Sequence, residues 1–418
     1  MTAEIVVMNT KGIALATDSA VTIAGRKVYN SANKLFELSK HNPVGVMFYE
    51  SVSLLNVPWE TLIKIYRNKL DDHQFDTLNE YVEAFLHFLN ENEYKEFMSK
   101  SNEENFIRNS LQLNVSGIHS DLSDLSMTLY SEYGELNLQN DIQELYIHHG
   151  WNYLRDRIQS LEEKKYIDVF NNSDFNLLIE KYGAEVEELI HKQFENHLLI
   201  EEWTEEIKYI VIQALLKDFP NNYYSGIVFA GFGSKEIYPS VITLKVDGKI
   251  NGKIKYSIMP HQTKSISNSL GASIIPLAQR DMVENFLTGI HIEMQEFVFA
   301  GLEREFEGLS HTLTEKLKDS FKEETNLETI EDSITDELLE VYRRFNRALY
   351  HYKRKNFIDP IVDIVEALPV EELAEMAEAL LSITSLKRKM SISLETVGGP
   401  IDVALITKGD GFTWVKRK

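Results

Sequence analysis

The strand-like segments of this 418-residue chain fall into three clusters, and long helical stretches separate the clusters. One cluster lies within the first 50 residues, one within residues 224–259 and one within residues 401–416. The first begins with the apolar run Ala3–Met8, a turn at Asn9–Gly12, and a second run, Gly12–Asp18. Strands that are clustered between helices favour layered sheets over alternating βαβ units. The sequence therefore predicts an α+β fold.

The two stretches between the clusters, residues 71–222 and 291–360, carry apolar residues at helical spacing and are rich in acidic residues. Within the remaining parts, Ile274–Ile290 and Pro369–Leu386 also have the pattern of helices. We therefore expect a core that two helical insertions interrupt. The expected segments are a core part over 1–70, a helical insertion over 71–222, core again over 223–290, a second helical insertion over 291–360, and a closing helix and strands over 361–418.

Composition narrows the classes of function. The chain has 43 basic and 65 acidic residues, and the net charge of −22 argues against non-specific binding of nucleic acid. The absence of cysteine excludes a disulfide framework, thiolate metal sites and a cysteine nucleophile, and it suits the reducing cytoplasm. We find no signal peptide and no apolar run near the roughly 20 residues that span a bilayer. The sequence predicts a cytoplasmic protein without a nucleic-acid or membrane partner.

Thr2 could supply both a nucleophile and a base. It follows Met1 and precedes Ala3, a context compatible with removal of Met1. The α-amine thus freed would titrate near ~7.7–8.0 and could accept the hydroxyl proton. Asp18 ends the second strand of the predicted hairpin, and Lys34 lies in the next strand, where its charge would lower the pKa of the amine. From residue types alone, an ordinary Asp18–Lys34 ion pair is the simpler interpretation.

The segment Thr2–Leu70 resembles the start of a proteasome β-type subunit and of the related bacterial HslV and Anbu peptidases. In that family the mature N-terminal threonine is followed by an acidic residue sixteen positions on and by a lysine thirty-two positions on. Thr2, Asp18 and Lys34 stand at these same intervals. The resemblance thus identifies Thr2, Asp18 and Lys34 as the candidate catalytic residues.

Two later segments also resemble this family. Gly398–Phe412 is similar to its closing strands, and Val228–Phe232 resembles its central strand. The resemblance covers about half of the chain, and the two helical insertions have no counterpart in the family. It implies a four-layer αββα Ntn-hydrolase (N-terminal nucleophile hydrolase) sandwich of two antiparallel sheets, interrupted by the helical insertions.

The reaction that the resemblance implies begins with attack of Thr2 Oγ on a peptide carbonyl. A backbone N–H in the turn after the fourth strand then stabilises the oxyanion, and here Tyr49 stands where the family has glycine. The mechanism requires no metal and no organic cofactor. By the same alignment, the apolar wall of the substrate pocket consists of Val21, Ala32 and Met47. Such a wall favours apolar or small side chains before the cleaved bond.

The residues that orient the threonine amine in the family are not retained. Leu394 and Val397 replace an Asp and a Ser that precede the family's Gly-Gly, and the Ser of a Gly-Ser-Gly turn falls at or beside Ser269. The nearby residues that could substitute for the missing groups are Ser269, Ser393 and Glu395.

Three functions follow from these observations. The resemblance favours a threonine-type endopeptidase that cleaves peptides or unfolded proteins in a self-compartmentalised homo-oligomer. Because the chain has no nucleotide-binding motif, ATP-driven unfolding would need a separate unfoldase partner. Loss of the amine-orienting residues and the two large insertions favour instead an inactive proteasome-like scaffold or partner-binding subunit. A third function is an Ntn amidase that acts on a small amide.

Overall fold

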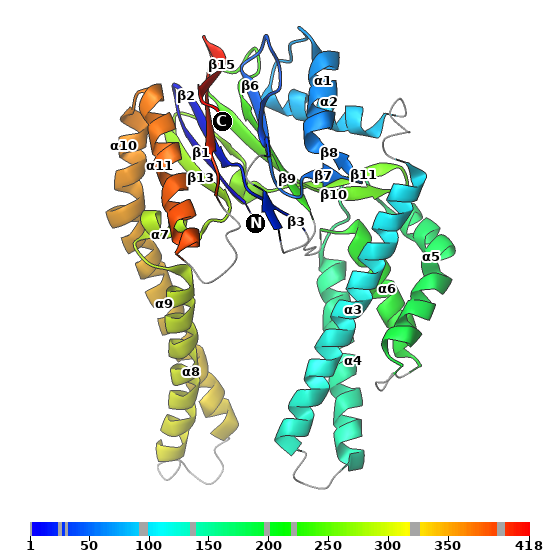
Figure 1. Ribbon diagram of the computed structural model, residues 1–418. Coiled ribbons are helices and arrows are strands. Elements are labelled where there is room, and N and C mark those ends of the chain that lie inside the picture. The colour runs from blue at the N-terminus through cyan, green and yellow to red at the C-terminus, as the bar shows by residue number, and fades with distance from the viewer. Residues whose placement is uncertain are drawn as a thin grey trace.

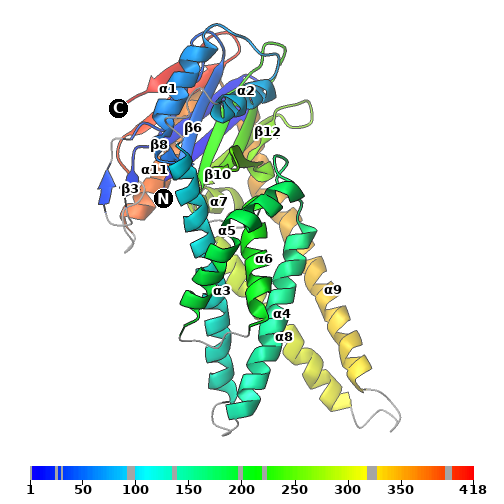
Figure 2. The same cartoon turned by 90° about the vertical axis from the view of Figure 1, so that its right-hand side faces the viewer.

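Two β-sheets and their covering helices form the upper part of the computed structural model in Figure 1, and two helical projections extend from it. Figure 2 shows that both projections extend to the same side of the sheets. The N-terminal end of β1 (Ala3–Asn9) lies at the edge of the sheets that faces this side. The structure describes residues 2–23, 27–29, 32–91, 99–133, 139–195, 201–218, 224–317, 327–390 and 398–418.

The first sheet brings together segments from both ends of the chain. Its strand order is β13-β1-β2-β14-β15, and every neighbouring pair is antiparallel. The tight β1–β2 hairpin sets Glu4 opposite Thr17, so the end of β2 lies beside the start of β1. The other strands of this sheet are β2 (Gly12–Asp18), β13 (Ala272–Ala278), β14 (Ile401–Thr407) and β15 (Gly411–Lys416).

The second sheet has the order β11-β10-β9-β6-β5 and is also antiparallel, with the short β12 paired to β10. Two small hairpins, β3–β4 and β7–β8, flank the two sheets. The bounds of these strands are β3 (Val21–Ile23), β4 (Lys27–Tyr29), β5 (Leu35–Glu37), β6 (Val44–Glu50), β7 (Ser53–Leu54), β8 (Val57–Pro58), β9 (Ser225–Gly231), β10 (Ser240–Ile250), β11 (Lys253–Ile258) and β12 (Lys264–Ser265).

The two sheets pack against each other through the side chains of alternate residues. Val6 and Met8 of β1 and Met47 of β6 belong to this core between the sheets. The intervening residues of β1 point outward, where α10 (Asp359–Ala367) and α11 (Val370–Lys389) cover the first sheet. The predicted α+β class with antiparallel sheets is therefore confirmed.

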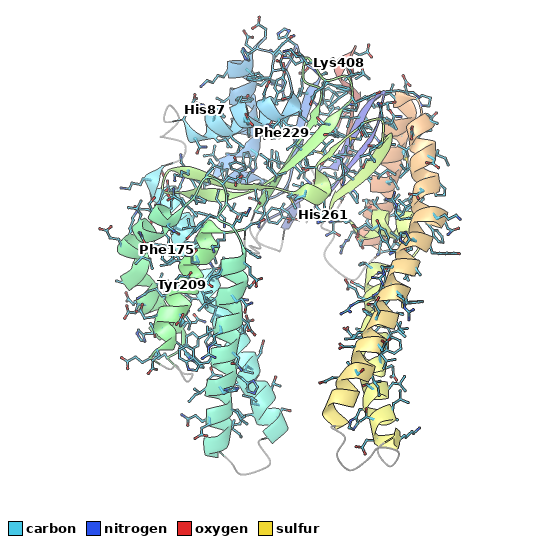
Figure 3. All side chains as sticks on the ribbon, turned by 180° about the vertical axis from the view of Figure 1, so that it is seen from behind. His87, Phe175, Tyr209, Phe229, His261 and Lys408 are labelled. Carbon is cyan, nitrogen blue, oxygen red and sulfur yellow. The ribbon has the colours of Figure 1, made fainter. Side chains whose placement is uncertain are left out.

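The outer face of the second sheet is covered by α1 (Trp59–Leu70) and α2 (Leu78–Asn90). Phe229 of β9 packs against Phe85 of α2, with ring centroids 5.3 Å apart, and Figure 3 shows Phe229 on the sheet near α2. A Thr77 capping box starts α2 by pairing the free backbone N–H groups of its first turn. Because α2 packs on this sheet, it belongs to the core. The first helix that leaves the sheets, α3, begins at Lys100, and not at residue 71, where the expected insertion starts.

The first projection is a helical block with a core of its own. Its helices are α3 (Lys100–Tyr133), α4 (Gln139–Glu163), α5 (Asn172–Gln193) and α6 (Trp203–Leu216). Apolar residues from all four helices form one buried cluster, which reaches β10 through Ile250. Phe175 and Tyr209 join α5 to α6 with ring centroids 5.6 Å apart (Figure 3). This block therefore packs as a unit, and it contacts the second sheet at β10, through Ile250, and at β11, through the Asp174–Lys253 ion pair.

The second projection consists of α8 (Ile292–Leu317) and α9 (Leu327–Lys353), which lie side by side in Figures 1 and 2. Phe299 of α8 packs edge-on against Tyr342 and Phe345 of α9. The chain enters α8 from the short α7 (Asp281–Thr288), and a π-helical turn over Arg354–Ile358 leads from α9 to α10.

The prediction of a single helix over Ile274–Ile290 is wrong. The first part of this segment is β13, which pairs along the whole of β1, and a helix begins only at Asp281. Pro276 is tolerated because β13 is an edge strand, where a missing backbone N–H removes no hydrogen bond from the sheet. A short apolar run has the same periodicity in a buried strand as in a buried helix, so the sequence pattern could not separate the two.

Candidate functional site

Thr2 and Glu4 lie at the start of β1 and point to the same side. Side chains two residues apart on an extended chain share a face, and the next residues on this face, Val6 and Met8, lie in the core between the sheets. The Thr2 hydroxyl donates a hydrogen bond to Glu4 Oε2 at 3.1 Å. Thr2 is only 3% exposed. The hydroxyl therefore sits at the end of the inter-sheet core with a carboxyl acceptor beside it.

Asp18 and Lys34 form a buried ion pair next to this hydroxyl. Lys34 Nζ lies 2.6 Å from Asp18 Oδ1, and the side chains of both residues are 1% exposed. Asp18 also accepts hydrogen bonds from the backbone N–H of Ala3, at 3.3 Å, and of Gly398, at 2.9 Å. One carboxylate thus joins the start of β1, the start of β5 and the segment before β14. Lys34 also contacts Glu4, which accepts the hydrogen bond of the Thr2 hydroxyl, so Glu4 links the ion pair to Thr2.

Glu4 is the second carboxyl group of this site. Its Oε1 lies 3.5 Å from Lys34 Nζ and accepts a hydrogen bond from Thr17 Oγ1 at 3.4 Å. Burial raises the pKa of Glu4 to about 8, because the carboxylate loses its hydration; Lys34 opposes this rise, and the neighbouring Asp18 adds to it. Near neutral pH, Glu4 is therefore a carboxyl group that can gain or lose a proton beside Thr2.

The backbone N–H that faces the Thr2 hydroxyl belongs to Glu50, whose nitrogen lies 3.5 Å from Thr2 Oγ1. In β6 the N–H groups alternate between the two neighbouring strands. The Phe48 N–H donates to the carbonyl of Lys34, so the Tyr49 N–H is directed to the opposite side, toward β9. Glu50 has a positive φ of 63°, a sparsely populated conformation for a non-glycine residue, which ends the strand at this point.

The three residues of the predicted substrate wall lie in different environments. Val21 starts β3 and is partly exposed. Ala32 is also partly exposed; its N–H donates to the Ser19 carbonyl at 3.1 Å, and its own carbonyl accepts from Lys418 Nζ. Met47 has no exposed surface and belongs to the core between the sheets. Val21 and Ala32 are thus partly exposed to solvent, whereas Met47 is a core residue.

The prediction that Ser269 orients the Thr2 amine is wrong. Ser269 lies on the turn before β13, and Ala272, which starts β13, is opposite Asn9 at the far end of β1. With a rise of about 3.4 Å per residue, the length of β1 separates this turn from Thr2 by about 20 Å. The other two predicted amine-orienting residues lie outside the described residues: Ser393 and Glu395.

Three groups of the site were not predicted from the sequence. One signal was available for Glu4, because an acidic residue interrupts the apolar run Ala3–Met8, and a charge on a buried strand needs a partner. Gln279, which follows β13, donates its backbone N–H to the Thr2 carbonyl at 3.2 Å. The contact from Gln279 depends on the β13–β1 register, and the orientation of Glu50 depends on the end of β6. No residue type signals either of these.

The described residues contain no group of three or more His, Asp or Glu side chains arranged to hold a metal ion. In the site itself, Lys34 Nζ lies between the carboxyl groups of Glu4 and Asp18 and contacts both. Within the same ranges, none of the helices combines the length and apolar character that a membrane crossing requires. The chemistry available at the site is thus a buried hydroxyl between a carboxyl acceptor and a backbone N–H donor.

Comparison with known proteins gives only weak likenesses. No protein-family model matches the chain, and no curated protein sequence matches it. The solved structures that align with it include Anbu from Hyphomicrobium sp. strain MC1, with a TM-score of 0.30, and an Anbu (Gly-1) mutant from the same strain, with a TM-score of 0.31. Each alignment has 7% identity and covers 100% of this chain and 86% of that chain. Values of this size do not assign the chain to a family.

Proposed function

We propose that this chain is a threonine-type hydrolase of peptide bonds, in which Thr2 Oγ is the nucleophile after removal of Met1. The observation that carries the proposal is the environment of this hydroxyl. Thr2 Oγ1 lies 3.1 Å from the carboxyl group of Glu4 and 3.5 Å from the backbone nitrogen of Glu50, beside the buried Asp18–Lys34 pair. A nucleophile, a proton acceptor and an N–H donor within hydrogen-bond reach are the groups that acyl transfer requires.

The proposed reaction has two halves. Thr2 Oγ bonds to the carbonyl carbon while its proton moves to the acceptor, and the carbonyl oxygen becomes an oxyanion. The C–N bond then breaks, the leaving amine takes the proton, and an ester on Thr2 remains. Water attacks this ester in the same way and restores the hydroxyl. The N–H of Glu50, in place of that of Tyr49, is the proposed oxyanion donor, because it is the one directed at Thr2.

Two groups could accept the Thr2 proton. The resemblance implies the α-amine that removal of Met1 would create. We infer that Glu4 takes this role, because it already accepts the Thr2 hydrogen bond and its pKa of about 8 lies near the value of an effective general base at neutral pH. Asp18 and Lys34 are proposed to hold Glu4 and the first residues of β1 in position.

Two further proposals concern the type of fold and the assembly of the chain. Two packed antiparallel sheets with helices on both outer faces support the αββα Ntn-hydrolase sandwich that the sequence resemblance implies. The same resemblance implies a homo-oligomer, in which the helical projections are available as interfaces, with unfolded polypeptide as substrate and an ATP-dependent unfoldase as a separate partner. Sedimentation gives the mass of the assembly, and a particle of 48.2 kDa, the mass of one chain, would contradict the oligomer.

Two observations favour the alternative of an inactive scaffold. Ser269 lies about 20 Å from Thr2 along β1 and so cannot hold its amine, and Thr2 is 97% buried. A scaffold predicts that a threonine-directed electrophile leaves the chain unlabelled, whereas the hydrolase predicts one adduct at Thr2.

The direct test is Thr2→Ala, assayed with unstructured fluorogenic peptides. We expect cleavage to fall by at least about a thousandfold, because no other group can form the acyl-enzyme. Ser269→Ala is the matched control, since it removes an exposed hydroxyl of the same chain and should leave cleavage unchanged. Circular dichroism checks that both variants fold. Retained cleavage in Thr2→Ala would refute the proposal.

A further inference from the structure

A pocket of about 240 Å³ opens beside the site, where the second sheet meets the first helical block. One wall is formed by Ser51, which directly follows Glu50, and by Tyr224, whose carbonyl accepts from the Ser51 N–H at 3.2 Å. Because the Glu50 N–H faces Thr2 Oγ, the pocket begins one residue, about 3.8 Å of chain, beyond the candidate oxyanion donor. The wall of the pocket and the candidate oxyanion donor therefore belong to consecutive residues at the end of β6.

The floor of the pocket carries a buried carboxylate with a free oxygen. Asp247 lines the pocket, and its side chain is only 3% exposed. Its Oδ2 lies 3.0 Å from Lys255 Nζ, whereas its Oδ1 is buried and has no hydrogen-bond partner among the described residues. A buried carboxylate oxygen without a partner is costly, and a donor from a water, an ion or a ligand would remove that cost.

The backbone directs Asp247 into the pocket through a β-bulge. In the β10–β11 ladder, Val246 is opposite Tyr256 and Gly248 is opposite Lys255, so Asp247 is the extra residue without a cross-strand partner. A bulge of this kind re-aims one side chain, and bulges are over-represented next to active sites. The β-bulge in β10 therefore determines the orientation of the Asp247 side chain.

The opposite wall comes from the N-terminal part of α3. Phe106 lies against Gly248, where a Cβ atom would stand 2.6 Å from the ring, so glycine is what allows α3 to approach the bulge. Asn102, Asn105 and Asn109 follow one another at helical spacing and line the pocket with amide groups. The first helical block thus completes a pocket that the sheets alone would leave open.

The chemistry of this lining fits a side chain with several N–H donors and a positive charge. Asp247 is the only charged residue among those that line the pocket. The nearest cations are already engaged, Lys255 with Asp247 Oδ2 and Lys245 with Asp218 at 3.2 Å. A guanidinium would give the free Oδ1 a charge-assisted hydrogen bond, and the asparagine amides would accept its other N–H groups. The volume is below that of drug-sized ligand sites and suits a single side chain.

We propose that this pocket binds an arginine side chain of the peptide substrate, next to the bond that is cleaved. The interpretation as a substrate pocket rests on the proposed function, but binding of the side chain can be measured without any cleavage. The proposal changes the specificity expected from the sequence, which predicts apolar or small side chains before the cut. It also gives the first helical insertion a role in substrate selection, through Asn105 and Asn109.

The test uses the full-length Thr2→Ala variant, which is expected not to cleave peptides. Two small probes are compared, Nα-acetyl-arginine amide and Nα-acetyl-citrulline amide. Citrulline has nearly the shape of arginine but carries no charge. Isothermal titration or ligand-observed NMR should show that the arginine amide binds at least about tenfold more tightly. Asp247→Asn should remove this preference, because the free oxygen loses its charge. Equal affinity for the two probes, or an unchanged preference in Asp247→Asn, would overturn the proposal.

A second pair of variants covers the case in which Asp247→Asn fails to fold. Asn105→Lys places a positive charge on an exposed position of the pocket and should abolish the preference for arginine. Asn79→Lys makes the same change at an exposed position of α2, away from the pocket, and should leave the preference for arginine unchanged. Binding of arginine without cleavage by the native chain would refute only the hydrolase. Cleavage without a preference for arginine would refute only the pocket.

Discussion

At the scale of residues, the site concentrates polar groups where the fold excludes water. Thr2, Glu4, Asp18 and Lys34 are each 3% exposed or less, and each has at least one polar partner. The two carboxyl groups share one ammonium, so the cluster carries an excess negative charge whenever Glu4 is ionised. Burial and this imbalance explain why the pKa of Glu4 rises to about 8, while the hydrogen bond to Thr2 limits the rise.

Glu4→Gln tests the role of this carboxyl group. The carboxylate is the base, and its fraction grows as the pH rises through about 8, so kcat of the native chain should rise with a midpoint near that pH. The variant should lose about 10²–10⁴-fold in kcat and lose this midpoint. Glu293→Gln, at a side chain that is 84% exposed, is the control and should change neither. A variant that keeps the native pH profile would assign the base to the α-amine instead.

Lys34→Met tests how much the buried ion pair stabilises the fold. Removal of the ammonium leaves Asp18 and Glu4 buried without their cation, which should cost about 3–5 kcal/mol in the free energy of unfolding. Lys64→Met breaks the half-exposed pair with Glu60 and should cost less than about 1 kcal/mol. Urea unfolding compares the two variants, and similar losses would contradict the account of the buried pair.

At this scale the sequence predicts some positions well and others not at all. Asp18 lies beside Ala3 because a tight hairpin returns β2 along β1 in a fixed register, and Asp18 in turn pairs with Lys34. Ser269 has a suitable side chain and stands in a suitable turn, but the register of β13 carries it to the far end of β1. Backbone N–H groups such as that of Glu50 have no residue signature, so only the strand geometry reveals them.

At the scale of elements, the pairing of β6 with β9 positions the Glu50 N–H. Gly226 of β9 is opposite Tyr49, and its missing side chain leaves room for the Tyr49 ring. The Tyr49 hydroxyl is fixed by a 2.6 Å hydrogen bond to Gln262. The Tyr49 ring therefore packs closely over Gly226. Tyr49 directly precedes Glu50, whose N–H faces Thr2.

Gly226→Ala should disturb this arrangement. The new Cβ would lie 2.0 Å from the Tyr49 ring, and the closely packed core between the sheets can yield only by moving the ring. We expect a loss of about 1–3 kcal/mol in stability and a lower kcat, because Glu50 moves with Tyr49. Gly117→Ala on α3, where a Cβ meets no atom within 4 Å, should instead add up to about 1 kcal/mol. Thermal unfolding separates these outcomes, and an unaffected Gly226→Ala would contradict the packing argument.

The sequence predicts most strands and helices from their periodicity, and its errors have identifiable causes. β10 reads as a strand, but the bulge at Asp247 depends on a mismatch with β11 that only the paired structure contains. Ile274–Ile290 reads as a helix because its apolar residues satisfy both periods, and pairing with β1 makes its first part a strand. Local pattern thus predicts element type where one period dominates, and tertiary pairing decides elsewhere.

At the scale of the whole molecule, both helical projections extend to the side on which β1 starts (Figures 1 and 2). The first block reaches the second sheet through Ile250 and closes the pocket at Asp247 with α3. The sequence predicts that helices interrupt the core, but composition and periodicity do not say on which side they emerge. The side on which they emerge follows from the ends of the strands that they connect.

The central claim is that Thr2 is an active N-terminal nucleophile. It is tested most directly by the intact mass of the chain expressed without an N-terminal tag, before and after exposure to a threonine-reactive β-lactone. The account predicts the mass without Met1 and then one added β-lactone, with no addition in Thr2→Ala. Retention of Met1, or its removal without an adduct, would contradict the account and support the inactive scaffold.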